Sequence, residues 1–161
     1  MQTITMRPMH QGDGAFLCEI FRDNAEYYAI FHDPEDRISA WEKRVAHFTA
    51  QAQVHHQIIE ADHTPIGWLS FSQLSPTDCE LDILVLHKAY LHQGYGTAAL
   101  SHFLKSCRNG QVKTVVLHVN QSNTRAIRFY KKFGFQIIAE EIVPECNDAI
   151  NLAQYQMQLQ L

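Results

Sequence analysis

The segment 80–100, which reads ELDILVLHKAYLHQGYGTAAL, restricts the fold of this chain more than any other stretch. Its first part, 80–86, is almost wholly apolar at its centre and predicts a strand that is covered on both faces. After a short loop, Gly94-Tyr95-Gly96 begins a stretch that predicts a helix. The first turn of a helix has unpaired N–H groups and a partial positive charge, and glycines there let an anion approach the backbone. The segment therefore predicts an anion-binding site where a strand leads into a helix.

Two well-known phosphate-binding motifs fit this segment poorly. The dinucleotide-binding motif G-x-G-x-x-G follows the first strand of a βαβ unit. Here Ala99 would be allowed at the third glycine position, but the strand is the fourth that we predict, and no second βαβ half follows. The P-loop motif needs G-K-[ST], and no lysine follows either glycine. A nucleotide-binding domain therefore stays only as a third alternative, behind the two functions considered below.

The spacing of apolar residues predicts an α/β fold built around one mixed central β-sheet. Strands are expected over 2–7, 54–61, 66–74, 80–86, 112–120, 135–143 and 151–161, and helices over 13–23, 33–53, 94–108 and 123–133. The order along the chain is strand, two helices, three strands, helix, strand, helix and two strands, so we expect helices to flank the sheet. A length of 161 residues suits a single domain that comprises residues 1–161.

The last predicted strand, 151–161, alternates apolar residues with glutamine more regularly than any other part of the chain. A long strand of this kind can pair within the sheet or with a second copy of the chain, because an exposed strand tends to find a partner. The sequence leaves both arrangements open, and the second would produce a homodimer.

Composition argues against several classes of protein. A net charge of −4 at pH 7 disfavours a nucleic-acid-binding protein, which would need a surplus of positive charge. No apolar run approaches the roughly 18 residues that a membrane-spanning helix needs. The N-terminal sequence lacks the basic start and apolar stretch of a secretory signal. The four cysteines form no C-x-x-C pair, so we expect reduced thiols, no metal site and a cytoplasmic location.

A second informative segment, 119–135, reads VNQSNTRAIRFYKKFGF and predicts a helix that begins near Asn123 and ends at Gly134. Its apolar face contains Ala126 and Tyr130. The small alanine leaves room for a molecule beside the helix, and a tyrosine hydroxyl on an apolar face needs a hydrogen-bond partner. This helix is therefore a second candidate for the functional site.

Together, the two segments resemble the GCN5-related N-acetyltransferase (GNAT) family. The family's pattern [QR]-x-x-G-x-[GA] falls on residues 91–96, where Leu91 replaces the usual glutamine or arginine. Its pattern N-x-x-[AS]-x-x-x-Y-x-K-x-G-F falls on residues 123–135 with every spacing met. The opening Met6-Arg7-Pro8 also resembles the family's first strand.

The resemblance implies a GNAT-like acyl-CoA N-acyltransferase fold and an enzyme that moves an acetyl group from acetyl-CoA to a primary amine by direct attack in a ternary complex. It implies no metal. Backbone N–H groups of the glycine loop would bind the pyrophosphate, and a leucine at position 91 still provides such a group. The residues implied for binding acetyl-CoA are Leu84, Val85, Leu86, Leu91, His92, Gln93, Gly94, Tyr95, Gly96, Thr97, Asn123 and Tyr130.

The same resemblance implies catalytic roles for two residues. Tyr130 would be the general acid that protonates the leaving thiolate. Glu80 is the candidate general base, directly or through water, because some family members have a glutamate there. Strand alternation predicts that Glu80 and Asp82 share one face with Leu84 and Leu86. The alternatives for the base are Asp82, His118 and Asn120.

The acceptor amine is the least defined part of this prediction. The segment 23–42 combines acidic and aromatic residues, which would suit a cationic amine but also fits a solvated helix face. A small-molecule amine and a peptide amine therefore both stay open. The alternative function is a non-catalytic acyl-CoA-binding regulatory module on the same fold, which Leu91 favours and which Tyr130 and Glu80 disfavour.

Overall fold

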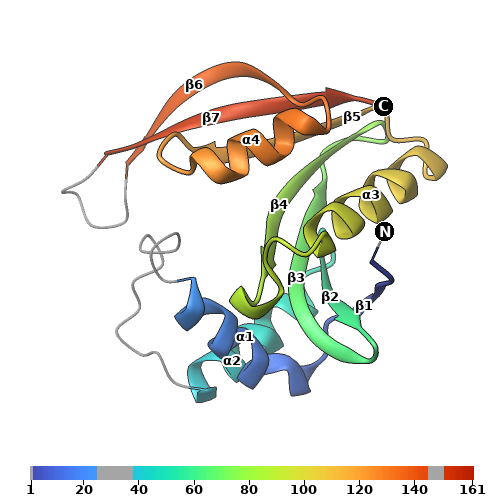
Figure 1. Ribbon diagram of the computed structural model, residues 1–161, viewed down its shortest axis with the longest axis vertical. Coiled ribbons are helices and arrows are strands. Elements are labelled where there is room, and N and C mark those ends of the chain that lie inside the picture. Colours follow the sequence, from blue (N-terminus) through green and yellow to red (C-terminus); the bar gives the residue numbers. More distant parts are fainter. Residues whose placement is uncertain (1, 25–37, 145–150) are drawn as a thin grey trace.

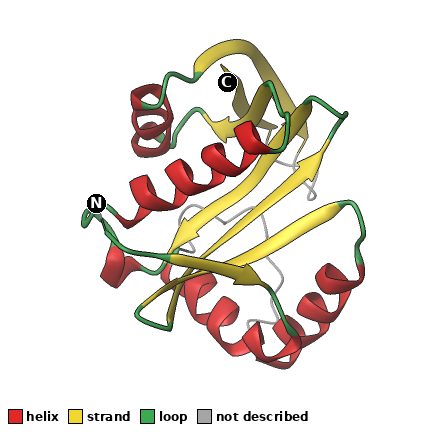
Figure 2. Cartoon of the chain, turned by 90° about the vertical axis from the view of Figure 1, so that its right-hand side faces the viewer, coloured by secondary structure: helices red, strands yellow, loops and turns green. Residues whose placement is uncertain are grey.

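The computed structural model describes residues 2–24, 38–144 and 151–161. Its strands form one seven-stranded sheet in the order β1-β2-β3-β4-β5-β7-β6, with helices on both faces (Figure 1, Figure 2). In chain order the elements are β1 (Thr5–Pro8), η1 (Gln11–Asp13), α1 (Gly14–Asp23), α2 (Ile38–Ala50), β2 (Val54–Ala61), β3 (Thr64–Gln73), β4 (Asp78–Leu86), η3 (Lys88–Tyr90), α3 (Tyr95–Asn109), β5 (Thr114–Asn120), α4 (Thr124–Lys132), β6 (Gln136–Pro144) and β7 (Asn151–Gln160). This order confirms the mixed α/β sheet that the sequence predicts.

Two apolar cores hold the helices on opposite faces of the sheet. One core joins α3 and α4 to the sheet through residues such as Leu100, Phe103 and Ile127. The other joins α1 and α2 through Leu17 and Trp41. Adjacent residues of one strand enter different cores because side chains alternate along a strand. Each helix is therefore fixed by burial of its apolar face.

The parallel pairing between β4 and β5 is short, and this opens the sheet. Only Asp78–Glu80 of β4 pairs with Thr114–Val116 of β5. Beyond this point β4 continues beside β3 as far as Leu86, whereas β5 continues beside β7 as far as Asn120. The two strands diverge in Figure 1, and the edge of β4 that faces β5 loses its partner.

A β-bulge in β4 corrects one expectation about strand faces. Ser70 of β3 pairs with Ile83 and Phe71 pairs with Leu81, so Asp82 is the extra residue. Leu81 lies in the core beneath α3, whereas Ile83 packs against the core beneath α1 and α2. The prediction that Glu80 and Asp82 share a face with Leu84 and Leu86 is therefore wrong, because the bulge shifts the alternation by one residue.

The structure also tests several expectations about single segments. The glutamine-rich tail forms β7 and pairs within the sheet, antiparallel to both β5 and β6. The expected start of the second helix at Asp33 lies outside the described residues. Cys18, Cys79 and Cys107 are free and buried, whereas Cys146 lies outside the described residues. None of the described helices is long and apolar enough to cross a membrane.

A buried ion pair ties β1 to the start of α1. Two nitrogens of the Arg7 guanidinium donate to the Asp13 carboxylate at 2.7 and 2.9 Å, and its Nε donates to Glu60 at 2.7 Å. Asp13 is 3% exposed. Burial alone would raise the pKa of Asp13, but the bonds from Arg7 and from the His10 backbone N–H outweigh it and lower that pKa below its ordinary value. The carboxylate thus stabilises the fold above the pKa it has in the unfolded chain, and this contribution is lost as the pH falls through the lowered pKa.

We expect Asp13→Asn to lower the free energy of unfolding at pH 7 by roughly 1–3 kcal/mol, because Arg7 loses its charged partner. The variant should also lose part of the decline in stability that the wild type shows below about pH 4, where unfolded aspartate takes up its proton. Denaturant unfolding at several pH values measures both effects. Asp62→Asn, in the exposed β2–β3 turn, is the control. An unchanged acid dependence in Asp13→Asn would contradict this account.

Candidate active site

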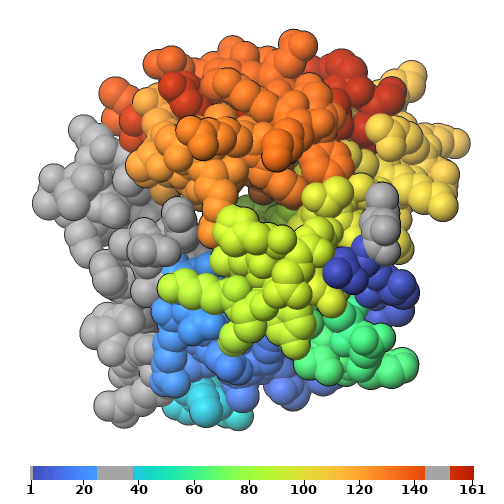
Figure 3. Space-filling view, in the orientation of Figure 1, coloured from blue at the N-terminus to red at the C-terminus, as the bar shows by residue number. Residues whose placement is uncertain are grey.

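A cleft lies where β4 separates from β5. Its volume is about 520 Å³, and Figure 3 shows it as a hollow between the orange residues of α4 and the yellow-green residues after β4. Four regions form its walls: the end of β4, the loop and first turn of α3, α4 with the residue before it, and the residue that ends α1. The residues that line it are Asn24, Leu84, Val85, Leu86, Leu91, His92, Gly94, Gly96, Thr97, Asn123, Thr124, Arg125, Ala126, Arg128, Phe129, Tyr130 and Lys132.

Most of the residues that the sequence nominates for acetyl-CoA lie in this cleft. They are Leu84, Val85, Leu86, Leu91, His92, Gly94, Gly96, Thr97, Asn123 and Tyr130. Gln93 and Tyr95 do not line it. The Gln93 amide instead donates to the backbone oxygen of Ala89 at 2.6 Å, and the Tyr95 ring packs edge-on against Tyr90. Glu80 also lies outside the cleft.

The first turn of α3 presents free backbone N–H groups to the cleft. Gly94 precedes the helix with φ +89°, a left-handed conformation that favours glycine, and no side chain caps the turn. Among the described residues, no hydrogen-bond acceptor is found for the N–H groups of Tyr95, Gly96 and Thr97. A Cβ atom at Gly96 would come no closer than 3.7 Å to Leu86 or Phe129. These amides are therefore open to an anion.

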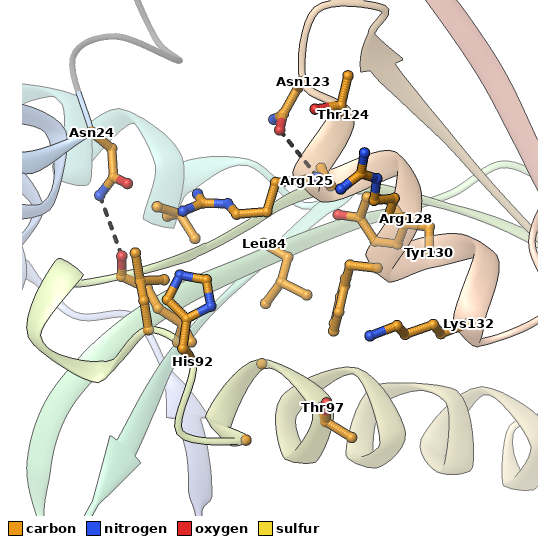
Figure 4. A pocket seen from close by; sticks show the side chains of 17 residues that line it. Asn24, Leu84, His92, Thr97, Asn123, Thr124, Arg125, Arg128, Tyr130 and Lys132 are labelled. Carbon is orange, nitrogen blue, oxygen red and sulfur yellow. Dashed lines mark hydrogen bonds between the residues drawn. The ribbon is translucent and has the colours of Figure 1, made fainter.

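Positive charge gathers on the opposite wall. Arg125, Arg128 and Lys132 project from α4 into the cleft, and His92 lies across from them (Figure 4). Within residues 2–24, 38–144 and 151–161, no aspartate or glutamate lines the cleft, although the whole chain has a net charge of −4. These cations were not predicted as a group from the sequence. Their spacing of i, i+3 and i+7 on one helix face was the signal that could have identified them.

Two asparagines fix the walls of the cleft. The Asn123 side chain accepts a hydrogen bond from the Ala126 N–H at 3.1 Å, which confirms it as the N-cap of α4. Asn24 is 2% exposed and was not predicted from the sequence. Its amide donates to the backbone oxygen of Ile20 at 2.9 Å. It also donates to the backbone oxygen of Leu86 at 3.3 Å (Figure 4), so it joins the end of α1 to the end of β4.

Tyr130 lies on the cleft wall formed by α4. Its ring packs edge-on against Phe129 and Phe135, with centroids 5.4 and 5.6 Å away. The side chain is half-buried. These contacts restrict the ring, while the hydroxyl lies on the wall that faces Leu84 across the cleft (Figure 4).

We call the face of the sheet that lies opposite α3 and α4 the acceptor face. A row of polar side chains lies on it. The Glu80 carboxylate lies 2.7 Å from His118 Nδ1, and Glu141 Oε2 lies 3.5 Å from His118 Nε2. The hydroxyl of Ser72 donates to Asp82 at 2.8 Å. Burial is the main factor that raises the pKa of Asp82, and the negative charge of Glu80 adds to it. Within the described residues, no group of three or more His, Cys, Asp and Glu residues could hold a metal ion.

The four candidates for a general base differ in their hydrogen-bond partners. Asn120 is engaged as an acceptor, since its Oδ1 receives a hydrogen bond from Gln154 at 2.9 Å. Asp82 is bound by Ser72. Glu80 and His118 are bonded to each other and lie beside the last parallel pair, Glu80–Val116, where β4 leaves β5.

Comparisons with known proteins point to one family. The sequence model described as "Acetyltransferase (GNAT) family" matches residues 16–135. The N-alpha-acetyltransferase 50 of Danio rerio is 48% identical over 50 residues, which are 30% of this chain and 30% of that protein. The match therefore spans less than a third of that curated relative.

Solved structures show the same fold. Spermidine N-acetyltransferase from Vibrio cholerae, in complex with CoA and spermine, superposes with a TM-score of 0.79 at 15% identity, over 98% of this chain and 95% of that chain. The paiA N-acetyltransferase from Thermoplasma acidophilum, in complex with coenzyme A, gives a TM-score of 0.68 at 19% identity, over 99% of this chain and 100% of that one. Because the family model covers most of the sequence and the fold agrees throughout, this chain belongs to the GNAT acetyltransferase family.

Proposed function

We propose that this protein acetylates a primary amine with acetyl-CoA as the donor. The observation that carries the proposal is a cleft whose described lining residues include four basic side chains and no acidic one, in a chain with a net charge of −4. A surplus of positive charge in one cleft of an acidic protein suits a ligand with several phosphates. Acetyl-CoA supplies an activated acyl group as a thioester, and it has phosphates at the end remote from that group.

The residues of the cleft fit the two ends of this donor. The free N–H groups of Tyr95, Gly96 and Thr97 suit a pyrophosphate, and Arg128 and Lys132 suit further phosphate oxygens. The unpaired edge of β4 over residues 84–86 provides backbone groups that can bind the amide-containing arm, as an added strand would. In this arrangement, the basic side chains Arg128 and Lys132 of α4 compensate for the absence of a polar side chain at Leu91.

Direct attack in a ternary complex is the mechanism that the cleft favours. A double-displacement mechanism would need a protein nucleophile beside the thioester. Among the described lining residues there is no cysteine, and Cys79 and Cys107 face each other in the core with their sulfur atoms 3.8 Å apart. The amine itself would then form the new C–N bond.

Tyr130 is the proposed general acid. The thiolate that leaves the tetrahedral intermediate needs a proton, and the phenol on the cleft wall can donate one. On the acceptor face, Glu80 and His118 together form the proposed base, since an amine must lose a proton before it can attack. The thioester would lie between these two groups, where β4 and β5 separate.

A non-catalytic acyl-CoA-binding regulatory module is the second candidate. Leu91 favours it, because a polar side chain at that position usually helps to bind the pyrophosphate in the family that this chain resembles. Such a module would bind CoA in the same cleft and would not need Tyr130 or the Glu80–His118 pair. The two tests below separate it from the enzyme.

The first test is ligand-dependent thermal stability. We expect CoA to raise the melting temperature, by the equivalent of about 2.7 kcal/mol at a hundred times its Kd, whereas NAD and ATP should have little effect. Arg128→Ala should weaken CoA binding roughly tenfold, because it removes one charge-assisted contact. Lys131→Ala, which removes an adjacent charge outside the cleft, should not. Equal stabilisation by NAD or ATP would contradict the assignment of the ligand.

The second test is turnover. With acetyl-CoA and a panel of amines, Tyr130→Phe should lower kcat by roughly 10²–10⁴-fold, as expected for a lost general acid, with CoA affinity unchanged. Thiol release measures kcat, and Tyr90→Phe is the control, since its ring packs outside the cleft. A full kcat in Tyr130→Phe would refute the role of this residue. Stabilisation by CoA without thiol release from any amine would favour the regulatory module.

A further inference from the structure

Asn24, which follows the last residue of α1, lines the cleft although it is only 2% exposed. Its side-chain nitrogen carries two hydrogens, and both are used, in the bonds to the backbone oxygens of Ile20 at 2.9 Å and Leu86 at 3.3 Å. Because a backbone oxygen can only accept, these bonds determine which end of the carboxamide is the nitrogen. The side chain is therefore held in one orientation, between α1 and the end of β4.

The oxygen of the same carboxamide differs from the nitrogen in its surroundings. Within residues 2–24, 38–144 and 151–161, no N–H or O–H group donates a hydrogen bond to Asn24 Oδ1. A carboxamide oxygen can accept two hydrogen bonds, and buried polar atoms in folded proteins nearly always have a partner. Figure 4 shows this oxygen on the side of the amide that faces the cleft. Asn24 Oδ1 is therefore an acceptor that is positioned for a donor group of a ligand.

The backbone groups of β4 that face the cleft follow from its pairing with β3. The His87 N–H donates to the Ile66 oxygen at 2.9 Å, which makes these two residues a hydrogen-bonded pair that continues the antiparallel ladder. Hydrogen-bonded pairs alternate with pairs whose N–H and C=O groups point away from the partner strand. Leu86 and Leu84 are at these alternate positions, so their N–H and C=O groups point to the edge that β5 has left.

Asn24 occupies one of these four backbone groups and supplies a replacement for it. Its N–H bonds the Leu86 carbonyl. No bond to the Leu86 N–H, or to either backbone group of Leu84, is found in the part of the chain that the structure describes. A carboxamide has the same donor and acceptor as a peptide group. Asn24 therefore extends the edge of β4 as one more peptide unit would, and its oxygen replaces the occupied carbonyl of Leu86 as an acceptor.

A second attachment holds the end of α1 against the end of β4. His87, the residue after β4, has its Nε2 3.0 Å from the Asp23 carboxylate and 3.2 Å from that of Glu19. Asp23 directly precedes Asn24, so the two attachments fix adjacent residues. An acceptor that is already held in place binds a ligand with a smaller loss of conformational freedom.

We propose that Asn24 Oδ1 binds an amide N–H in the arm of acetyl-CoA. This inference rests on the proposed function, because it needs this donor in the cleft. The arm would pair with the backbone of Leu84 and with the Leu86 N–H in the manner of an added strand. Asn24 would provide the remaining acceptor, in place of the Leu86 carbonyl. Asn24 is then a binding residue that selects donors with an amide-containing arm, and it takes no part in the chemical step.

The inference predicts that Asn24 contributes only to binding of the part of the ligand that contains the arm. Asn24→Ala should weaken the binding of CoA roughly three- to tenfold, because the arm loses one neutral hydrogen bond. The same variant should bind adenosine 3′,5′-bisphosphate, which is the phosphate end of CoA without the arm, as the wild type does. Isothermal titration calorimetry measures both dissociation constants. Asn109→Ala, at the exposed end of α3, is the matched control and should change neither.

Three results would overturn the inference. An unchanged or tighter Kd for CoA in Asn24→Ala would mean that the arm does not use Oδ1 and can bond the released Leu86 carbonyl. Equal losses for CoA and the bisphosphate would mean that Asn24 only supports the fold. If the KM for the amine rises while the Kd for CoA stays unchanged, the side chain binds the acceptor substrate instead.

A spectroscopic measurement tests the contact without a change in sequence. The carbon NMR signal of the Asn24 side-chain carbonyl should shift when CoA binds, and it should not shift when adenosine 3′,5′-bisphosphate binds. Saturation with CoA without such a shift would overturn the inference.

The same measurements separate this inference from the proposed function. Thiol release from acetyl-CoA together with an unchanged Kd in Asn24→Ala would retain the acetyltransferase and overturn the role of Asn24. A weakened Kd and a shifted carbonyl signal without thiol release from any amine would support the role of Asn24 and favour the regulatory module. A wild type that does not bind CoA would overturn both proposals.

Discussion

The short parallel pairing between β4 and β5 is the constraint on which the rest of this site depends. Pairing ends at Glu80 and Val116, and after that each strand follows a different neighbour. A continuous ladder would have satisfied the backbone groups of residues 84–86 and closed the sheet. Its interruption leaves the edge of β4 beyond Glu80 without a partner from β5, and the cleft lies at this edge. The bulge at Asp82 lies just beyond Glu80, where the pairing with β5 ends. It reverses the face of the sheet to which the following side chains point, so that Leu84 faces the cleft.

Charge is separated across this opening. The side that contains α3 and α4 presents Arg125, Arg128 and Lys132, together with the free amides of the α3 N-terminus. The acceptor face presents Glu80, Asp82 and Glu141 around His118. Opposite charges on the two faces would guide an anionic donor and a cationic acceptor to different sides of one reaction centre. The small net charge of the whole chain conceals this separation.

Much of the framework could be predicted from the sequence, because local signals determine it. The glycine at position 94, the cap at Asn123 and the regular alternation of β7 each depend on a few adjacent residues. The β-bulge could not be predicted in this way, since it depends on how β3 pairs with β4, and its effect is to reverse the expected face of Leu84. Asn24 was missed for a similar reason, because its bond to Leu86 joins residues 62 positions apart. The acceptor-face row likewise requires the strand order β4-β5-β7-β6, which periodicity does not specify.

The central claim is that the donor occupies the opening between β4 and β5 with its phosphates at the start of α3. Amide hydrogen exchange with and without CoA measures this most directly, because bound groups protect individual N–H protons. The account predicts slower exchange at Tyr95, Gly96 and Thr97 and along the free edge of β4, and no change in the β2–β3 turn. Unchanged exchange at both of these segments while CoA is bound would contradict it.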